Sequence, residues 1–122
     1  MKHNKIKVQA IVKAVSSDSR HSVKVETDSD YKYIIGIAAS PSLPSGVIIE
    51  DFKIKNESIF EDDIEVRIIQ SSTNVSCDHR FFTLFNPREV NSDNVSIDFN
   101  DPNYSSAYNA YFYILLTNVK PE

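Results

Sequence analysis

Apolar and polar residues alternate with a period of two along much of this chain. In the first such segment, residues 6–14, one face is wholly apolar and consists of Ile6, Val8, Ala10, Val12 and Ala14. The other face is mostly polar and consists of Lys5, Lys7, Gln9, Ile11 and Lys13. Successive side chains of a β-strand point to opposite faces of its sheet, so the pattern predicts a half-buried strand with its apolar face on the core.

Further segments with the character of short strands follow, and the connectors between them are rich in Ser, Asn, Asp and Pro. These segments are residues 21–27, 31–39, 47–54, 58–60, 64–70, 80–85, 95–99 and 108–118. Gly36 lies inside a nearly continuous apolar run, which predicts a bulge there. Asn56 predicts a hairpin turn over residues 55–57, because Asn tolerates the left-handed conformation. A short helical turn is expected over residues 101–107, where Pro102 suits a first helical position.

This spacing of strands predicts an all-β fold, with two antiparallel sheets packed as a sandwich. Several connections are long, as expected when strands cross between sheets, so a single jelly roll of eight or so strands fits best. An immunoglobulin-like sandwich is the nearest alternative. The length of 122 residues predicts one β-sandwich domain over residues 1–122.

Charge and hydropathy make two kinds of partner poor candidates. The 13 basic residues are scattered among 17 acidic ones, whereas a nucleic-acid binder gathers Lys and Arg to neutralise phosphates. No run approaches the roughly 20 apolar residues of a membrane span. Lys7, Gln9 and Lys13 also interrupt the apolar stretch that a signal peptide would need. The chain is therefore expected to be soluble and unprocessed, with no nucleic acid as partner.

Residues with catalytic or metal-binding chemistry form no recognised motif. Cys77, Asp78 and His79 are adjacent, but neighbours in an extended chain point in opposite directions and do not make a nucleophile–base pair. His3, His21 and His79 lie far apart in sequence, so surface histidines are expected in place of a zinc site. A cupin-type enzyme would need such residues to converge. The sequence predicts no catalytic residue, no cofactor and no metal.

Acidic loops leave calcium as a minor alternative. Carboxylate oxygens are the ligands that calcium prefers, and Asp98 and Asp101 flank the best candidate loop. The glycine-containing calcium-loop pattern is absent from the sequence, so solvated turns are the favoured interpretation.

The last strand segment has two apolar faces. One face carries Ala110, Phe112, Ile114 and Leu116, and the other carries Tyr111, Tyr113 and Leu115. Either loops cover the second face, or that face meets another subunit, since Tyr is enriched in the cores of interfaces. Phe81 and Phe82 would extend such a patch. The candidate assembly interface is Tyr104, Tyr108, Tyr111 and Tyr113.

Two segments, residues 31–37 and 51–69, carry a resemblance to a known family. Their shared feature is a hairpin carrying Ile59-Phe60, an acidic corner at residues 61–63, and a strand beginning Ile64-Glu65-Val66. Here the chain resembles the small single jelly-roll structural proteins of tailless icosahedral bacteriophages, over roughly half its length. The resemblance implies a pentameric vertex (penton) subunit or a minor capsid subunit, and it brings no catalytic residues.

The expected function is therefore that of a non-enzymatic virion structural protein, assembled in the host cytoplasm. Such a subunit self-associates, with a pentamer as one arrangement, and contacts neighbouring coat or spike proteins. The alternative is a carbohydrate-binding module or lectin-like receptor-binding domain. Tyr104, Tyr108 and Tyr111 would then stack on sugar rings, although the sequence contains no Trp.

Overall fold

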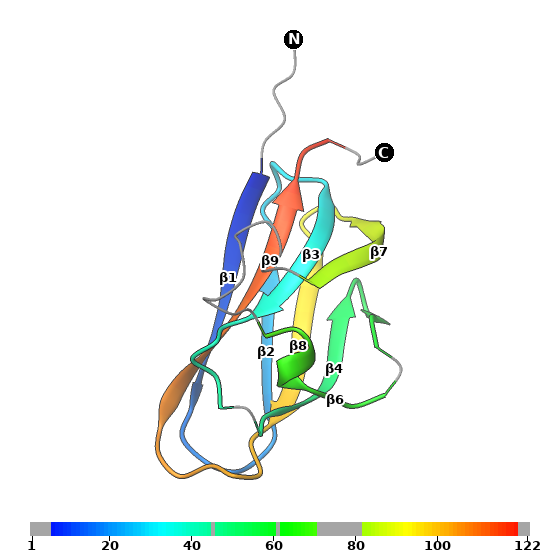
Figure 1. Cartoon of the computed structure of the whole chain (residues 1–122). Coiled ribbons are helices and arrows are strands. Elements are labelled where there is room, and N and C mark those ends of the chain that lie inside the picture. The colour runs from blue at the N-terminus through cyan, green and yellow to red at the C-terminus, as the bar shows by residue number, and fades with distance from the viewer. Residues whose placement is uncertain (1–5, 45, 61, 71–81, 120–122) are drawn as a thin grey trace.

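The computed structural model describes residues 6–44, 46–60, 62–70 and 82–119, and its strands form two packed antiparallel sheets (Figure 1). Sheet A consists, in spatial order, of β1 (Ile6–Val15), β9 (Tyr108–Thr117), β3 (Tyr33–Ala39) and β7 (Phe82–Glu89). Sheet B consists of β2 (His21–Glu26), β8 (Asn94–Asn100), β4 (Ile48–Ile54) and β5 (Glu57–Ser58), and β6 (Ile64–Glu65) also pairs with β4. Among the described residues, no helix has the length and apolarity needed to cross a membrane.

The order of strands in the two sheets is that of a jelly roll. Apart from the short β6, sheet A contains β1, β9, β3 and β7, and sheet B contains β2, β8, β4 and β5. The chain therefore crosses between the sheets at most connections, as in a double Greek key. An immunoglobulin sandwich would instead place its strands in an ABED sheet and a CFG sheet. The predicted all-β, two-sheet sandwich is confirmed.

A single hydrophobic core lies between the two sheets. Strand β9 contributes every second residue to it, namely Ala110, Phe112, Ile114 and Leu116, all of which are fully buried. From sheet B, β8 contributes Val95, Ile97 and Phe99. The ring centroids of Phe99 and Phe112 are 5.3 Å apart at an interplanar angle of 58°. This tilted aromatic contact joins the two sheets near the middle of the sandwich.

Strand β1 faces the opposite way from the sequence prediction. Ile11 and Val15 are buried, whereas Ile6, Val8 and Val12 are exposed by 67%, 50% and 45%. The wholly apolar face of β1 therefore points away from the core, and the face with the lysines points inward. The reason lies in the position of β1 at the edge of sheet A, where long polar side chains on the inward face extend past the rim of the core.

Two local predictions are confirmed. The pairing of β3 with both neighbours shifts register between Ile34 and Gly36, which is the expected bulge. Lys55 and Asn56 have φ angles of 55° and 67°, so the β4–β5 hairpin has two consecutive left-handed residues. Two such residues are the mark of a type I′ turn, whose twist matches that of the flanking strands.

Two other local predictions are wrong. The expected strand over residues 64–70 ends at Glu65, and a 3₁₀ helix over Val66–Ile68 follows. Val66 and Ile69 are both buried, and a spacing of three residues places them on one side of such a helix. Residues 101–107 form turns in place of a helix. There the Asn103 N–H donates to the Asp101 carboxylate, and such a side-chain bond competes with helix formation.

Candidate assembly surface

Most of the exposed large hydrophobic residues among the described positions lie on the outer side of β1 and β9. We call this side the outer β1–β9 face; it consists of Ile6, Val8, Ala10, Val12, Ala14, Tyr111, Tyr113 and Leu115. The two strands lie side by side in Figure 1 and pair along their whole length. Val8 is opposite Leu115, Ala10 opposite Tyr113, and Val12 opposite Tyr111.

This face has two properties that are unusual for a surface exposed to solvent. None of its eight side chains is charged. Of the five exposed large hydrophobic residues among the described positions, four belong to it: Ile6, Val8, Val12 and Tyr111. Single exposed apolar residues are ordinary on protein surfaces, but a contiguous apolar patch marks an interaction site.

The structure divides the four candidate tyrosines into two groups. Tyr111 and Tyr113 belong to the outer β1–β9 face. Tyr108 lies on the other side of β9, with Ala110 and Phe112, and Tyr104 packs against the core from the β8–β9 connection. The sequence of β9 already predicts this separation, because positions 108 and 111 are an odd number of residues apart and so lie on opposite faces of the strand. Phe81 lies outside the described residues, and of Phe82 only the strand position is described.

The outer residues of β1 are the part of this surface that sequence reasoning missed. They were expected in the core because they form the more apolar face of the strand. One signal pointed the other way: Ile11 and Val15, the two β1 residues that are buried, share the face of Lys7 and Lys13.

Polar contacts on the inner side of β1 fix its orientation. Lys7 forms an ion pair with Asp28 in the β2–β3 connection. The Gln9 amide donates to the Glu26 carbonyl at 2.9 Å and accepts from the Asp28 N–H at 3.2 Å. The pKa of Asp28 is lowered, first by the Lys7 hydrogen bond and then by the Asp30 N–H. These contacts connect β1 to the end of β2, so the apolar side of β1 is directed outward.

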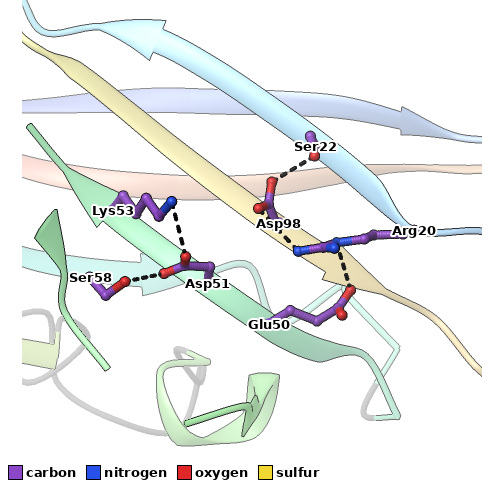
Figure 2. Close-up of polar contacts among 7 residues, drawn as sticks. All are labelled: Arg20, Ser22, Glu50, Asp51, Lys53, Ser58 and Asp98. Atoms are coloured by element: carbon purple, nitrogen blue, oxygen red, sulfur yellow. Dashed lines mark hydrogen bonds and ion pairs between the residues drawn. The ribbon is translucent and has the colours of Figure 1, made fainter. Parts of the chain in front are cut away.

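The outer face of sheet B has the opposite character, because its charges compensate one another. Asp51 and Asp98 lie opposite each other on β4 and β8 (Figure 2). Asp51 accepts from Ser58 Oγ at 2.6 Å and lies 3.4 Å from Lys53 Nζ. Like-charged residues directly opposite on a sheet repel, so these contacts offset the repulsion.

The negative charge of Asp98 is compensated by residues of the β1–β2 connection and of β2. It accepts from Ser22 Oγ at 2.6 Å and from Arg20 Nη2 at 3.3 Å (Figure 2). Arg20 Nε also lies 3.2 Å from Glu50 Oε1. The outer face of sheet B is therefore a solvated, internally neutralised surface, unlike the outer β1–β9 face.

The serine on β5 is expected to control the ionisation of Asp51. The pKa of Asp51 is lowered, first by the Ser58 hydrogen bond and also by Lys53. Ser58→Ala should raise this pKa toward the ordinary aspartate value, and Ser58→Thr, which keeps the hydroxyl, should not. Because the folded-state pKa is depressed, the associated stability is present above the unfolded pKa of about 4 and is lost as the pH falls through the folded value. Carboxyl carbon NMR titration of both variants measures the shift, and equal pKa values would contradict the role of Ser58.

The candidate calcium loop does not bring its two carboxylates together. Asp98 faces outward from sheet B, whereas Asp101 is 1% exposed. The Asp101 oxygens accept from the Asn103 N–H at 3.1 Å and from the Tyr108 hydroxyl at 2.9 Å. Within residues 6–44, 46–60, 62–70 and 82–119, no three His, Cys, Asp or Glu side chains are grouped so as to hold a metal ion.

The histidine prediction is wrong for the one histidine that the structure describes. His21 is buried at 8% exposure, with Nε2 3.1 Å from the Ser17 carbonyl and its ring centroid 5.6 Å from that of Phe99. His21 is therefore a packed, buried residue and not a surface histidine. His3 and the Cys77-Asp78-His79 cluster lie outside the described residues.

A shallow, open hollow near the start of β9 lies at the small end of the size range of ligand sites. It has a volume of about 280 Å³ and is lined by Ala14, Val15, Ser16, Ala107, Tyr108 and Asn109. Ligand pockets usually measure roughly 300–1,000 Å³ and are concave, with convergent polar groups. The outer β1–β9 face is therefore the stronger candidate for function.

Comparisons with known proteins give no relative of this chain: no family model, no curated protein and no solved structure matches it.

Proposed function

We propose that this protein is a non-catalytic virion structural subunit, which self-associates and contacts neighbouring coat proteins through the outer β1–β9 face. The observation that carries the proposal is the uncharged, exposed surface of two fully paired strands. Depletion of charge and enrichment of Tyr are the compositional marks of an interface core. Tyr111 and Tyr113 supply the aromatic part of this surface, and β1 supplies the aliphatic part.

The fold and the resemblance support the same role. Jelly rolls occur in viral capsid proteins, in lectins and in cupins, so the fold alone does not choose among them. The sequence of residues 51–69 resembles that of phage structural proteins, which act by assembly. A cupin-like role would need converging metal ligands, and the described residues contain no group of three His, Cys, Asp or Glu side chains that could hold a metal ion.

The carbohydrate-binding alternative has less support. Of the three tyrosines that would stack on sugar, only Tyr111 lies on the outer β1–β9 face. Tyr108 lies on the inner side of β9 and donates its hydroxyl hydrogen to Asp101, and Tyr104 packs against the core. A flat aromatic platform of all three is therefore not present.

Self-association and its dependence on this face are directly measurable. Light scattering coupled to size-exclusion chromatography should show a mass that rises with concentration for the unaltered chain. Val12→Lys places a charge at the centre of the face, and we expect it to weaken the association constant at least tenfold, which is about 1.4 kcal/mol. Asn94→Lys is the matched control, because Asn94 is an exposed neutral strand residue of sheet B.

Two outcomes would contradict the proposal. One is a strict monomer at the highest attainable concentration that also shows no affinity for the coat protein of its virion. The other is self-association that Val12→Lys and Asn94→Lys weaken equally, since the effect would then come from charge in general.

A further inference from the structure

The edges of the two sheets differ in how well they are protected from pairing with another strand. Natural edge strands are usually short, interrupted by a bulge or a proline, or decorated with charge. Strand β5 has only two residues, and β7 contains Pro87 and pairs with β3 across a register shift. Strand β2 exposes Lys24 and Glu26 on its outer side. Each of these three edges therefore carries at least one protective device.

Strand β1 has none of these devices on its outer side. It is ten residues long, contains neither Pro nor Gly, and pairs with β9 without any register shift. Its outward side chains are uncharged, and among the described strands β9 alone pairs with it. The two charges of β1, Lys7 and Lys13, point inward, and Lys7 is paired with Asp28. A long, regular edge with an uncharged outer side is a template for an additional strand.

We infer that β1 pairs in antiparallel fashion with β1 of a second copy of this chain, about a two-fold axis at Ile11. Sheet A would then continue across the dimer. Ala10 would lie opposite Val12 of the other copy, and Val8 opposite Ala14. The inference rests on the proposed self-association and moves its contact to the free edge of β1, which borders the outer β1–β9 face.

The inward charges of β1 select this register. Lys7, Gln9 and Lys13 share the inward face. With the axis at Ile11, Lys13 faces Gln9 of the other copy and Lys7 faces Val15, so no like charges lie directly opposite each other. With the axis one residue earlier, at Ala10, Lys7 would face Lys13 twice, and like charges directly opposite destabilise a pair of strands.

Length and parity exclude the other nearby registers. An axis at Ile11 pairs residues 7–15 of the strand Ile6–Val15, whereas an axis at Val12 pairs only residues 9–15. An axis between two residues would set outward side chains against inward ones, because a slip of one residue exchanges the two faces. The Ile11 register is therefore the longest one that places no like charges directly opposite each other.

A second copy fits this edge because the strand is complementary to itself. A two-fold contact uses the same patch on both subunits and closes after two of them. It would also join the two outer β1–β9 faces into one wider apolar surface, which remains available to coat protein.

Disulfide trapping tests the register. In a Cys77→Ser background, the variants Ala10→Cys and Val12→Cys each carry a single cysteine on the exposed side of β1. Opposed Cβ atoms in a strand pair are about 4.5–5.5 Å apart, close to disulfide geometry. Under mild oxidation, an equimolar mixture of the two variants should form at least tenfold more covalent dimer than either variant alone. A mixture of Ala10→Cys with Asn94→Cys gives the collisional baseline.

The outcomes separate this inference from the proposed function. Preferential cross-linking of Ala10→Cys with itself would overturn the Ile11 register. Cross-linking no stronger than the baseline, in a protein that light scattering shows to be oligomeric, would overturn the β1 pairing and leave self-association through another surface. A monomer that neither cross-links nor binds coat protein would overturn both.

Discussion

Replacing Phe112 by alanine is expected to lower the free energy of unfolding by about 3–5 kcal/mol, the usual cost of truncating a buried aromatic ring. Phe112 is fully buried on β9, which is paired on both sides within sheet A. Its ring contacts Phe99 of sheet B at a centroid distance of 5.3 Å. The substitution therefore leaves a cavity where the two sheets meet. Domains of this size are stable by about 5–15 kcal/mol, so the variant should be close to its unfolding limit.

Denaturant unfolding followed by far-ultraviolet circular dichroism measures this loss. The matched control is Tyr111→Ala, one residue earlier on the same strand. Tyr111 is 36% exposed on the outer β1–β9 face, so its truncation should cost no more than about 1 kcal/mol in the monomer. Equal losses for the two variants would contradict the orientation of β9.

The strands were predictable from the sequence because period-two alternation is a local property. In β9 the alternation also assigned the faces correctly, since Phe112 and Ile114 lack the polar hydroxyl group of Tyr111 and Tyr113. The sandwich class followed from the spacing of the segments, and the jelly roll was favoured by the long connections. The partner of each strand depends on long-range pairing and did not follow from either.

The orientation of strand β1 could not be predicted from its local sequence. Alternation identifies the two faces of a strand but not which of them meets the core. Here the choice depends on Asp28 and Glu26, which lie near the end of β2 and bind Lys7 and Gln9. Those partners come from a different sheet, so the sequence of β1 alone could not reveal them. The most exposed part of the candidate surface was therefore assigned to the core.

The candidate tyrosines also show what could and could not be predicted from local sequence. Tyr111 and Tyr113 were placed on one face by parity, and the structure places them there. Tyr104 and Tyr108 were added because they lie nearby in sequence. Asp101 draws Tyr108 inward through a hydrogen bond, and that bond depends on how the β8–β9 connection turns.

Replacing Asp101 by alanine is expected to cost about 1–3 kcal/mol, because two hydrogen bonds to a buried carboxylate are lost. The Asp101 carboxylate accepts from the Tyr108 hydroxyl at 2.9 Å and from the Asn103 N–H at 3.1 Å, and it is almost wholly buried. Denaturant unfolding measures the loss. Asp98→Ala is the control, because that carboxylate lies on the solvated face of sheet B and should contribute less than about 1 kcal/mol.

The partner of Asp101 gives this prediction a pH dependence. Burial raises the pKa of Tyr108, and the Asp101 hydrogen bond raises it further. The folded chain therefore keeps a proton that the unfolded chain releases near pH 10, so this stability is present below about pH 10 and is lost as the pH rises further. Tyr108→Phe should remove that part of the alkaline loss.

A double-mutant cycle decides whether the two residues act together. If the Tyr108–Asp101 hydrogen bond holds the β8–β9 connection, Asp101→Ala should cost less in a Tyr108→Phe background than in the unaltered chain, by about 0.5–1.5 kcal/mol. Strictly additive losses would mean that the bond does not contribute, and Asp101 would then stabilise the turn only through Asn103. In that case the alkaline loss of stability would come from the burial of Tyr108, which is the larger cause of its raised pKa, and Tyr108→Phe would still remove it.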